Sequence, residues 1–354
     1  MDLRDKISLL RELARYDCEV PLEDYIYRAH TPVGRKPLLK IMQTTYCEKN
    51  CSYCVFRRDR EETPRVFIDP EDLARGFMEL HRRGKVSGLF LTAGVFPHPE
   101  VVMERMIETV SILRKRYGYR GYVHLKVMPG VSDQTLEAAV ELASRVSINV
   151  EFPKEDILRR LARGKSIRSD ILPKIKRISE LLAEHPGRDQ TTQFIVGAAD
   201  ERDEDILRSA EFLYRRFGLR RVYYSSFRPV RNTPLEGKPP APVRREQRLY
   251  QADVLIREYG FSHSELPYED GNLPLDRDPK TAWAEKNPQL FPVELNSADL
   301  HLLLRIPGVG RRTALEITRR RREKRLRSPE DLKGIRQVNR ILRYVLLDGR
   351  FFGR

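Results

Sequence analysis

The chain has 354 residues, a formal net charge of +15 and four cysteines. This length suffices for one large domain, or for two domains that each have a hydrophobic core. No stretch approaches 18 apolar residues, so we expect no membrane-spanning helix. Few cysteines and no secretion signal favour a cytoplasmic location over a disulfide-stabilised secreted protein.

The positive charge is concentrated at the C-terminal end. Residues 295–354 hold 16 Lys and Arg against 6 Asp and Glu, so the last sixth of the chain carries +10 of the total of +15. Localised positive charge favours polyanionic partners, above all nucleic acids.

Residues 1–37 predict a lead-in, with a helix over residues 3–16 and an irregular, proline-interrupted stretch after it. From residue 38 to residue 228, short β-type runs alternate with amphipathic segments. The predicted strands are 38–45, 87–92, 121–128, 146–152, 191–197 and 221–227, and the predicted helices are 69–83, 99–117, 132–144, 155–162, 169–184 and 203–217. Asp69 and Ser132 are the predicted capping residues at the starts of the first and third of these helices. Six such units in a row predict an α/β fold with a parallel sheet, either an open partial (β/α)6 TIM-like barrel or a doubly wound sheet.

Three cysteines directly after the first predicted strand form the strongest local pattern. Cys47, Cys51 and Cys54 have the spacing C-x3-C-x2-C. Gaps this short let one loop bring three thiolates to an iron–sulfur cube, in which each thiolate binds a different iron. A fourth ligand is missing from the loop, so one iron would stay open for another molecule, as in open zinc sites.

Two other interpretations of these cysteines fit the sequence less well. Half a zinc site completed by a histidine lacks the second ligand pair that zinc sites usually have. Disulfides are disfavoured in a reducing cytoplasm. Cys18 stands apart from the motif and is predicted to be a small buried apolar side chain.

Several predicted strands carry polar side chains at every second position. His124 and Lys126 share one face of the third strand, Asn149 and Glu151 share one face of the fourth, and Gln193 stands among apolar neighbours in the fifth. Strands covered by helices on both faces are normally continuous apolar runs. One face of the sheet is therefore predicted to line a polar lumen that meets a ligand. The alternative is that these residues end their strands and bond to loops.

The cysteine spacing, with the aromatic Tyr53 before the last cysteine, resembles the signature of radical S-adenosylmethionine (SAM) enzymes. The resemblance implies a [4Fe-4S] cluster whose open iron binds SAM, and reductive cleavage of SAM to a 5′-deoxyadenosyl radical. It also implies a set of residues that contact the cofactor. These are Tyr53, Gly94 through its main chain, Lys126, Asn149 and Glu151 toward the ribose, Arg168 toward the carboxylate with Lys165 as the second choice, and Gln193 toward the adenine.

Residues 229–293 are predicted to form a capping or linking segment over the barrel mouth. Ten of the 23 prolines lie in this segment, and its only clear periodicity is a helix near residues 244–259. Trp283 is predicted to pack in a core, and His263 to be a loop residue rather than a catalyst.

Residues 294–354 contain the second strong pattern. Asn296-Ser297-Ala298 predicts the cap of a helix that reaches residue 304, and a second helix is predicted over residues 311–322 with Ala314 and Ile317 facing the first. The Ile-Pro-Gly-Val-Gly sequence at residues 306–310 separates the two helices. Its glycines allow a sharp turn and a close approach to a phosphate at the start of the second helix.

This pattern resembles the helix-hairpin-helix module of DNA repair and recombination proteins. The resemblance implies a small all-α nucleic-acid-binding domain, with residues 328–335 as a degenerate second copy of the motif. Such modules contact the phosphate backbone and carry little sequence information. The alternative is a solvated basic helix. The implied contact residues are Gly308, Val309, Gly310, Arg311, Arg312 and Arg319.

Taken together, the motifs resemble the radical SAM proteins assigned to DNA modification or repair that carry a C-terminal helix-hairpin-helix. Residues 88–91, 124–126 and 278–280 belong to the same match. The resemblance implies an enzyme acting on a nucleotide in DNA, an electron donor of the flavodoxin or ferredoxin type, and a protein partner similar to uracil-DNA glycosylases. An RNA-modifying radical SAM enzyme, for example one acting on tRNA, and a non-enzymatic iron–sulfur DNA-binding protein are the alternatives.

Overall fold

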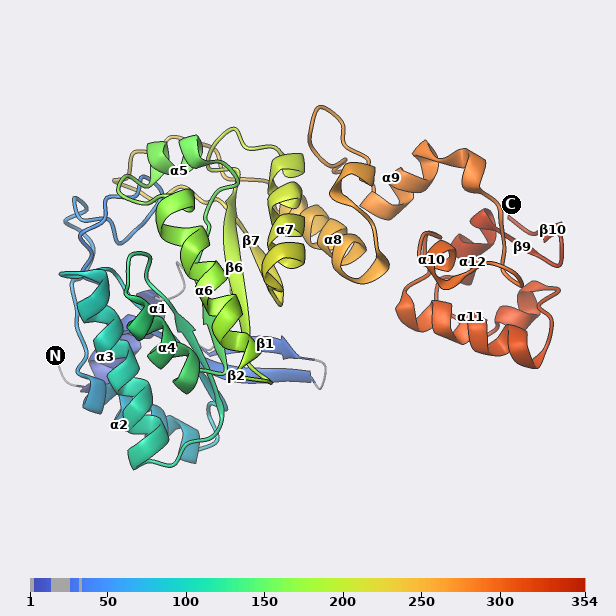
Figure 1. Ribbon diagram of the computed structural model, residues 1–354. Coiled ribbons are helices and arrows are strands. Elements are labelled where there is room, and N and C mark those ends of the chain that lie inside the picture. The colour runs from blue at the N-terminus through green and yellow to red at the C-terminus, as the bar shows by residue number, and fades with distance from the viewer. Residues whose placement is uncertain (1–2, 14–25, 32–33, 354) are drawn as a thin grey trace. The chain divides into compact units, whose positions relative to one another are not determined.

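The computed structural model describes residues 3–13, 26–31 and 34–353. The chain divides into two compact units. The N-terminal unit consists of residues 1–201 and 213–241, and the C-terminal unit consists of residues 202–212 and 242–354. Figure 1 labels the elements of both units, and helix α7 (Asp203–Phe217) contributes to each of them.

The N-terminal unit is built on one sheet of seven strands in the order β1-β2-β3-β4-β5-β6-β7. The six strands from β2 to β7 are parallel and follow chain order. A doubly wound sheet would reverse its strand order, so the open partial barrel is confirmed as the architecture. The strands are β1 (Tyr27–Thr31), β2 (Gly34–Met42), β3 (Gly88–Thr92), β4 (Tyr122–Lys126), β5 (Arg145–Ser147), β6 (Asp189–Val196) and β7 (Arg221–Ser226).

The two faces of this sheet differ in polarity, as predicted. One face carries fully buried aliphatic side chains such as Leu39 and Leu91. The opposite face carries Lys40, Phe90 and His124, which are direct register neighbours on β2, β3 and β4. The rings of Phe90 and His124 stack with centroids 4.2 Å apart, and the Lys40 ammonium lies 5.1 Å from the Phe90 centroid. The alternation of side chains along parallel strands therefore produces a polar interior.

Strand β5 is shorter than the predicted strand 146–152. The Thr192 hydroxyl accepts a hydrogen bond from the Val150 amide at 3.0 Å and donates one to the Ile148 carbonyl at 2.7 Å. One side chain thus takes the place of main-chain partners, and the ladder is interrupted. It resumes at Glu151, whose amide donates to the Gln193 carbonyl at 2.9 Å.

Helices follow the strands of the N-terminal unit, and neighbouring helices pack against one another in chain order. The predicted capping residues Asp69 and Ser132 are confirmed, because their side chains accept hydrogen bonds from the Glu71 and Thr135 amides. The predicted helix 99–117 ends as a wider π-type turn. The elements are α2 (Pro70–Arg82), α3 (Pro99–Ser111), η2 (Ile112–Arg116), α4 (Asp133–Leu142), α5 (Glu155–Leu161), η3 (Ile167–Ile171) and α6 (Leu172–Ala183).

The lead-in is more regular than predicted. Helix α1 (Leu3–Leu13) is present, but the stretch expected to be irregular contains β1, which pairs antiparallel with the first half of β2. The sequence pattern gave no sign of β1, because Pro32 directly follows it in the sequence and Pro37 interrupts its partner strand β2 opposite Arg28. Cys18 lies outside the described residues.

The C-terminal unit has its own small core, with Leu303, Ile306 and Ile317 fully buried. The predicted inward orientation of Ala314 and Ile317 is confirmed. A three-stranded sheet in the order β10-β9-β8 belongs to this unit, so the prediction of an all-α domain is wrong. Its further elements are α8 (Val243–Tyr259), η4 (His263–Glu265), α9 (Pro279–Lys286), η5 (Pro288–Leu290), β8 (Val293–Glu294), α10 (Leu300–Leu303), α11 (Arg311–Glu323), η6 (Pro329–Leu332), α12 (Val338–Ile341), η7 (Leu342–Tyr344), β9 (Val345–Leu347) and β10 (Arg350–Phe351).

The predicted cap at residues 296–298 is wrong. Helix α10 begins at Leu300, and its cap is Asp299, whose side chain accepts a hydrogen bond from the Leu302 amide. Asn296 instead joins two loops, because its side chain bonds both the amide and the carbonyl of Leu326. Within the described part of the chain, no helix is long and apolar enough to span a membrane.

Candidate active site

The cysteine loop begins where β2 ends, at the carboxyl edge of the parallel sheet. Its two stems are tied together: the Thr45 amide donates to the Val66 carbonyl at 2.9 Å, and the Val66 amide donates to the Thr45 hydroxyl at 2.8 Å. The Gln43 amide also donates to the Thr92 carbonyl at 2.8 Å, which joins the loop to the end of β3. Parallel α/β folds place their chemistry at this edge.

The guanidinium of Arg65 donates hydrogen bonds to several main-chain carbonyl oxygens of the cysteine loop. Arg65 donates to the Thr45 carbonyl at 2.7 Å on one side of the cysteines, and to the Phe56 and Arg57 carbonyls at 3.0 and 2.6 Å on the other side. Two further bonds, both at 3.3 Å, reach the carbonyls of Arg58 and Arg60. The planar fork of an arginine suits such a cluster of acceptors. Arg65 therefore closes residues 45–60 into a clamped loop.

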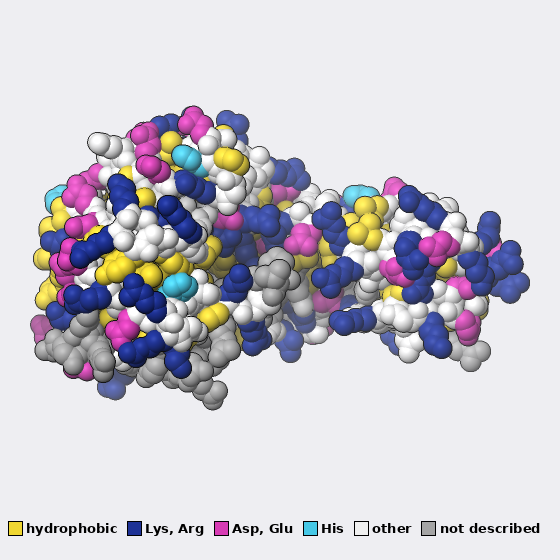
Figure 2. All heavy atoms as spheres, turned by 90° about the horizontal axis from the view of Figure 1, so that it is seen from below, with side chains coloured by type: hydrophobic (Ala, Val, Ile, Leu, Met, Phe, Trp, Pro, Cys, Tyr) yellow, Lys and Arg dark blue, Asp and Glu magenta, His cyan; other side chains and the backbone are white. Residues whose placement is uncertain are grey.

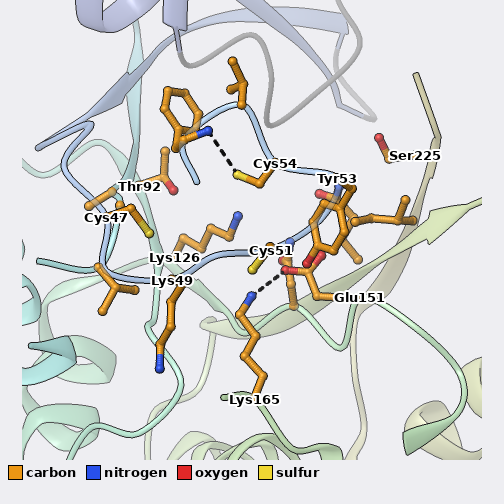
Figure 3. Close-up of a pocket in the computed structure, with 18 of the residues that line it drawn as sticks. Cys47, Lys49, Cys51, Tyr53, Cys54, Thr92, Lys126, Glu151, Lys165 and Ser225 are labelled. Atoms are coloured by element: carbon orange, nitrogen blue, oxygen red, sulfur yellow. Dashed lines mark hydrogen bonds and ion pairs between the residues drawn. The ribbon is translucent and has the colours of Figure 1, made fainter. Parts of the chain in front are cut away.

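A cavity of about 560 Å³ lies beside this loop, and the carboxyl-end residues of most strands line it. In Figure 3 the sulfur atoms of Cys47, Cys51 and Cys54 face a common space within it. Other lining residues include Met42, Lys49, Tyr53, Thr92, Gly94, Lys126, Asn149, Glu151, Lys165, Gln193, Ser225 and Arg228. Cavities of several hundred cubic ångströms hold cofactors and small molecules.

The three thiols are a metal-binding donor set. Burial, together with the adjacent Cys51 and Cys47, raises the pKa of the Cys54 thiol to about 12, because neighbouring thiolates repel one another. Burial also raises the pKa of Cys51, although the Lys165 ammonium acts against it. Metal binding removes this penalty, because the metal holds the sulfurs as thiolates.

The spacing of the donors fits a cluster better than a single ion. No group of three or more His, Cys, Asp or Glu side chains among the described residues has the geometry to hold one metal ion. In an iron–sulfur cube the three sulfur atoms need not reach the same metal ion, since each thiolate binds a separate iron. The described residues that line the cavity include no histidine and no fourth cysteine. The site therefore fits a cube with one iron left open.

A buried ion pair lies beside the thiols. The Lys165 ammonium is 3.2 Å from a Glu151 carboxylate oxygen, and both side chains are largely buried. Burial alone would lower the pKa of Lys165, but the negative Cys51 and Glu151 groups raise it overall, so the lysine stays charged. Glu151 itself has the positive φ of 67°, a strained backbone for a residue with a side chain. Such strain at a cavity wall is typical of functional residues.

Of the two basic residues predicted to contact the cofactor carboxylate, only one lines the cavity. Lys165 lines the cavity, whereas Arg168 is exposed and does not line it. The Arg168 amide donates to Glu155, and Asp170 accepts from the Ser166 amide, so the turn after Lys165 is fixed by acidic side chains. The second choice, Lys165, is thus the residue that the fold brings to the cavity.

Gly94 lines the cavity and has a structural role besides the predicted main-chain contact. Its amide donates to the Thr44 carbonyl at 2.8 Å, so main-chain contact with a ligand would have to use the carbonyl oxygen. A Cβ atom at this position would lie 2.1 Å from the Tyr46 carbonyl oxygen. Glycine is therefore required here because the cysteine loop crosses directly over the backbone.

The other predicted contact residues, Lys126, Asn149 and Gln193, line the cavity. Tyr53 does so as well, and its ring packs edge-on against Phe152 with centroids 5.6 Å apart. Burial raises the pKa of the Tyr53 hydroxyl well above its usual value, so the hydroxyl stays neutral.

Sequence reasoning missed several lining residues, among them Thr92, Ser225 and Arg228. Period-two alternation could have found Thr92 and Ser225, since they extend the polar face of β3 and β7 to its end. Arg228 lies in the loop after β7 and had no comparable signal.

In the C-terminal unit, Ile306-Pro307-Gly308-Val309 forms a turn closed by a 3.0 Å bond from the Val309 amide to the Ile306 carbonyl. We call it the first turn. Gly308 has φ +86°, which explains the glycine at this position. Most of the predicted contact residues here are engaged within the unit. Lys280 donates to the Val309 carbonyl at 2.5 Å, and the Arg311 amide donates to the Tyr259 hydroxyl.

The basic side chains predicted to contact nucleic acid differ in their surroundings. Arg311 and Arg312 are exposed. Arg319 is also exposed but forms ion pairs with Glu316 and Glu323 at 2.9 and 2.6 Å. Figure 2 shows Lys and Arg side chains over one face of this unit, with Asp and Glu among them.

Comparisons with known proteins bear on the N-terminal unit. The family model described as the radical SAM superfamily matches residues 41–213. The structure is similar to HydG, a maturase of the FeFe-hydrogenase, with 15% identity over 72% of this chain and a TM-score of 0.51. A second HydG structure, from Carboxydothermus hydrogenoformans, has 16% identity over 72% of this chain and a TM-score of 0.50.

The matches cover 54% and 56% of these two proteins, so the chain spans about half of their length. At this identity they establish the fold alone, an open half-barrel of six parallel strands. A search of the curated proteins found no match.

Proposed function

We propose that this chain is a radical SAM enzyme that modifies or repairs a nucleotide in DNA, because residues 41–213 match the radical SAM superfamily model. Enzymes of this superfamily use a [4Fe-4S] cluster and SAM. The observation that carries the proposal is the convergence of three thiols on a cavity whose described lining offers no fourth thiol and no imidazole.

The residues around the cavity have distinct roles in this proposal. Cys47, Cys51 and Cys54 hold the cluster. When bound, the cluster and SAM would supply radical chemistry for hydrogen abstraction, with the electron provided by a flavodoxin- or ferredoxin-type donor. The buried Lys165 ammonium suits the SAM carboxylate, and Glu151 can accept hydrogen bonds from the ribose hydroxyls.

The apolar side chains of the cavity support water exclusion. Val55 and Phe56 follow the last cysteine and are buried, and Met42 and Ile195 also line the space. A water-excluding wall protects a reactive intermediate from side reactions.

The nucleic-acid part of the proposal rests on the C-terminal unit. Residues 295–354 carry a net charge of +10, and a sharp turn precedes the basic helix α11. Such a unit can hold a phosphate backbone while the N-terminal unit acts on one nucleotide. A base in a duplex must leave the stack to reach a cavity, so damaged or single-stranded DNA is the favoured substrate.

The test is anaerobic reconstitution with iron, sulfide, SAM and dithionite, followed by mass spectrometry. A radical SAM enzyme releases 5′-deoxyadenosine, whereas an iron–sulfur binding protein without activity releases none. With deuterated DNA or RNA present, deuterium should appear in 5′-deoxyadenosine only for the true substrate. Deuterium transfer from RNA alone would replace DNA by RNA in the proposal, and transfer from neither polymer would overturn the nucleic-acid assignment.

A further inference from the structure

The C-terminal unit contains a second turn with the same geometry as the first. In Leu332-Lys333-Gly334-Ile335 the Ile335 amide donates to the Leu332 carbonyl at 3.0 Å, and Gly334 has φ +85°. The preceding Lys333 has φ −53° and ψ 133°, which makes this a type II turn. A helical turn (η6) precedes it and α12 follows, so the two turns are internal repeats of one design.

The first turn packs against other residues of the C-terminal unit. Besides the bonds from Lys280 and to Tyr259, a Cβ atom at Gly308 would lie 3.1 Å from the Ile341 side chain, and one at Gly310 would lie 3.1 Å from the Tyr259 hydroxyl. Val309 is buried. The first turn is thus held between α8, α9 and α12 and has little surface left for a partner.

The second turn is exposed to solvent, both in the burial of its residues and in the space around its glycine. Lys333, Gly334, Arg336 and Gln337 are all exposed. The nearest atom to a Cβ built on Gly334 is an Arg320 nitrogen, 4.0 Å away. The second turn therefore presents its backbone to solvent, where the first presents it to protein.

The carbonyl oxygens of the second turn are drawn inward. Arg320 on α11 donates to the carbonyls of Asp331 and Lys333, each at 2.9 Å, and Glu316 fixes the same guanidinium at 2.7 Å. Carbonyl oxygens repel an anion, so this arrangement removes two of them from the outer surface. The cationic side chains of Lys333 and Arg336 remain exposed.

The charges of the second turn are not neutralised nearby. Asp331, the closest acid in the sequence, pairs with Lys324 at 2.9 Å and accepts from the Arg327 and Ser328 amides. Lys333 and Arg336 form no ion pair with an acidic side chain of the described residues. They differ in this from Arg325 and Arg327, which both lie beside Asp348.

We infer that the second turn, with Lys333 and Arg336, is the contact surface of this unit for the phosphate backbone of a nucleic acid, and that the first turn is an internal brace. The inference rests on the proposed nucleic-acid substrate and moves its binding surface away from residues 308–310. A phosphodiester chain fits better than a protein partner, because the second turn offers exposed cations but none of the exposed large apolar side chains that anchor protein interfaces.

The test compares three double variants of the full chain in binding a fluorescent single-stranded or duplex oligonucleotide. Lys333→Ala/Arg336→Ala removes the charges of the second turn, and Arg311→Ala/Arg312→Ala removes those after the first. Arg325→Ala/Arg327→Ala is the matched control, since it removes the same charge from exposed but paired positions. Circular dichroism checks that all three are folded.

We expect the second-turn variant to bind at least about tenfold more weakly than the parent, and the slope of log K against log salt concentration to be smaller in magnitude by about 1 to 2. The affinity of the control should stay within about threefold of that of the parent. Equal losses in the second-turn variant and the control would reduce the effect to net charge and overturn the inference. So would a larger loss in the Arg311/Arg312 variant. If the parent binds nucleic acid and the second-turn variant binds as well, only this inference fails; if the parent binds none, the proposed function fails with it.

Discussion

Replacing Arg65 by alanine tests whether the clamp on the cysteine loop determines cluster binding. The change removes hydrogen bonds of 2.6 to 3.0 Å to the carbonyls of Thr45, Phe56 and Arg57. Each contributes about 1 kcal/mol net, so their sum is about 3 kcal/mol, or about a hundredfold change in an equilibrium constant. The two longer bonds are left out of the sum because weak contacts at the surface contribute little.

Losing these hydrogen bonds should destabilise the loop that positions the thiols, so the variant should retain the cluster poorly. Iron and sulfide per chain, the visible absorption of the reconstituted protein and its bleaching rate under a chelator measure this. The matched control is Arg58→Ala in the same loop, because Arg58 is exposed and pairs only with the exposed Asp59 in this structure. Arg65→Lys should recover part of the retention, since an ammonium can reach fewer of the carbonyls.

Two outcomes would contradict the role of Arg65 as a positioning residue. One is full iron content with an unchanged bleaching rate in Arg65→Ala. The other is a fall in the melting temperature of the cluster-free protein large enough to explain the loss of iron, because the residue would then only stabilise the fold. The electron paramagnetic resonance spectrum of the reduced cluster separates a displaced ligand set from a merely smaller folded fraction.

Three further changes have defined outcomes. Cys51→Ala should abolish iron binding and 5′-deoxyadenosine release while leaving oligonucleotide affinity within about threefold, as measured by anisotropy. Gly94→Ala should lower iron content severalfold, because a Cβ atom 2.1 Å from the Tyr46 carbonyl oxygen must displace the loop, and normal iron content would refute the crossing. Burial lowers the pKa of Lys280 to about 7, so between pH 7 and about 10 the unfolded chain holds a proton that the folded chain has released, and folding stability should rise with pH. In chemical denaturation, the free energy of unfolding of the parent should rise by up to about 1.4 kcal/mol per pH unit relative to that of Lys280→Met. Parallel pH profiles of the two proteins would refute the lowered pKa of Lys280.

The sequence alone determined the features that repeat with a simple period. Alternating polar and apolar residues predicted both faces of the barrel strands, because side chains along a strand point in opposite directions. Capping residues predicted the starts of α2 and α4, since a local side chain can satisfy the first helical amides. The cysteine spacing predicted a metal site from the sequence alone, because its three candidate ligands lie in one short loop.

Only the tertiary structure decided what depends on contacts distant in sequence. Lys165 rather than Arg168 reaches the cavity because acidic side chains from neighbouring elements fix the turn between them. Arg65 looks like any basic residue in the sequence, and its role exists only once two stems of the loop meet around it. The better-matched of the two C-terminal turns proved to be the buried one, because long-range contacts with α8 and α9 occupy it, and no pattern within the motif encodes which surface its neighbours cover.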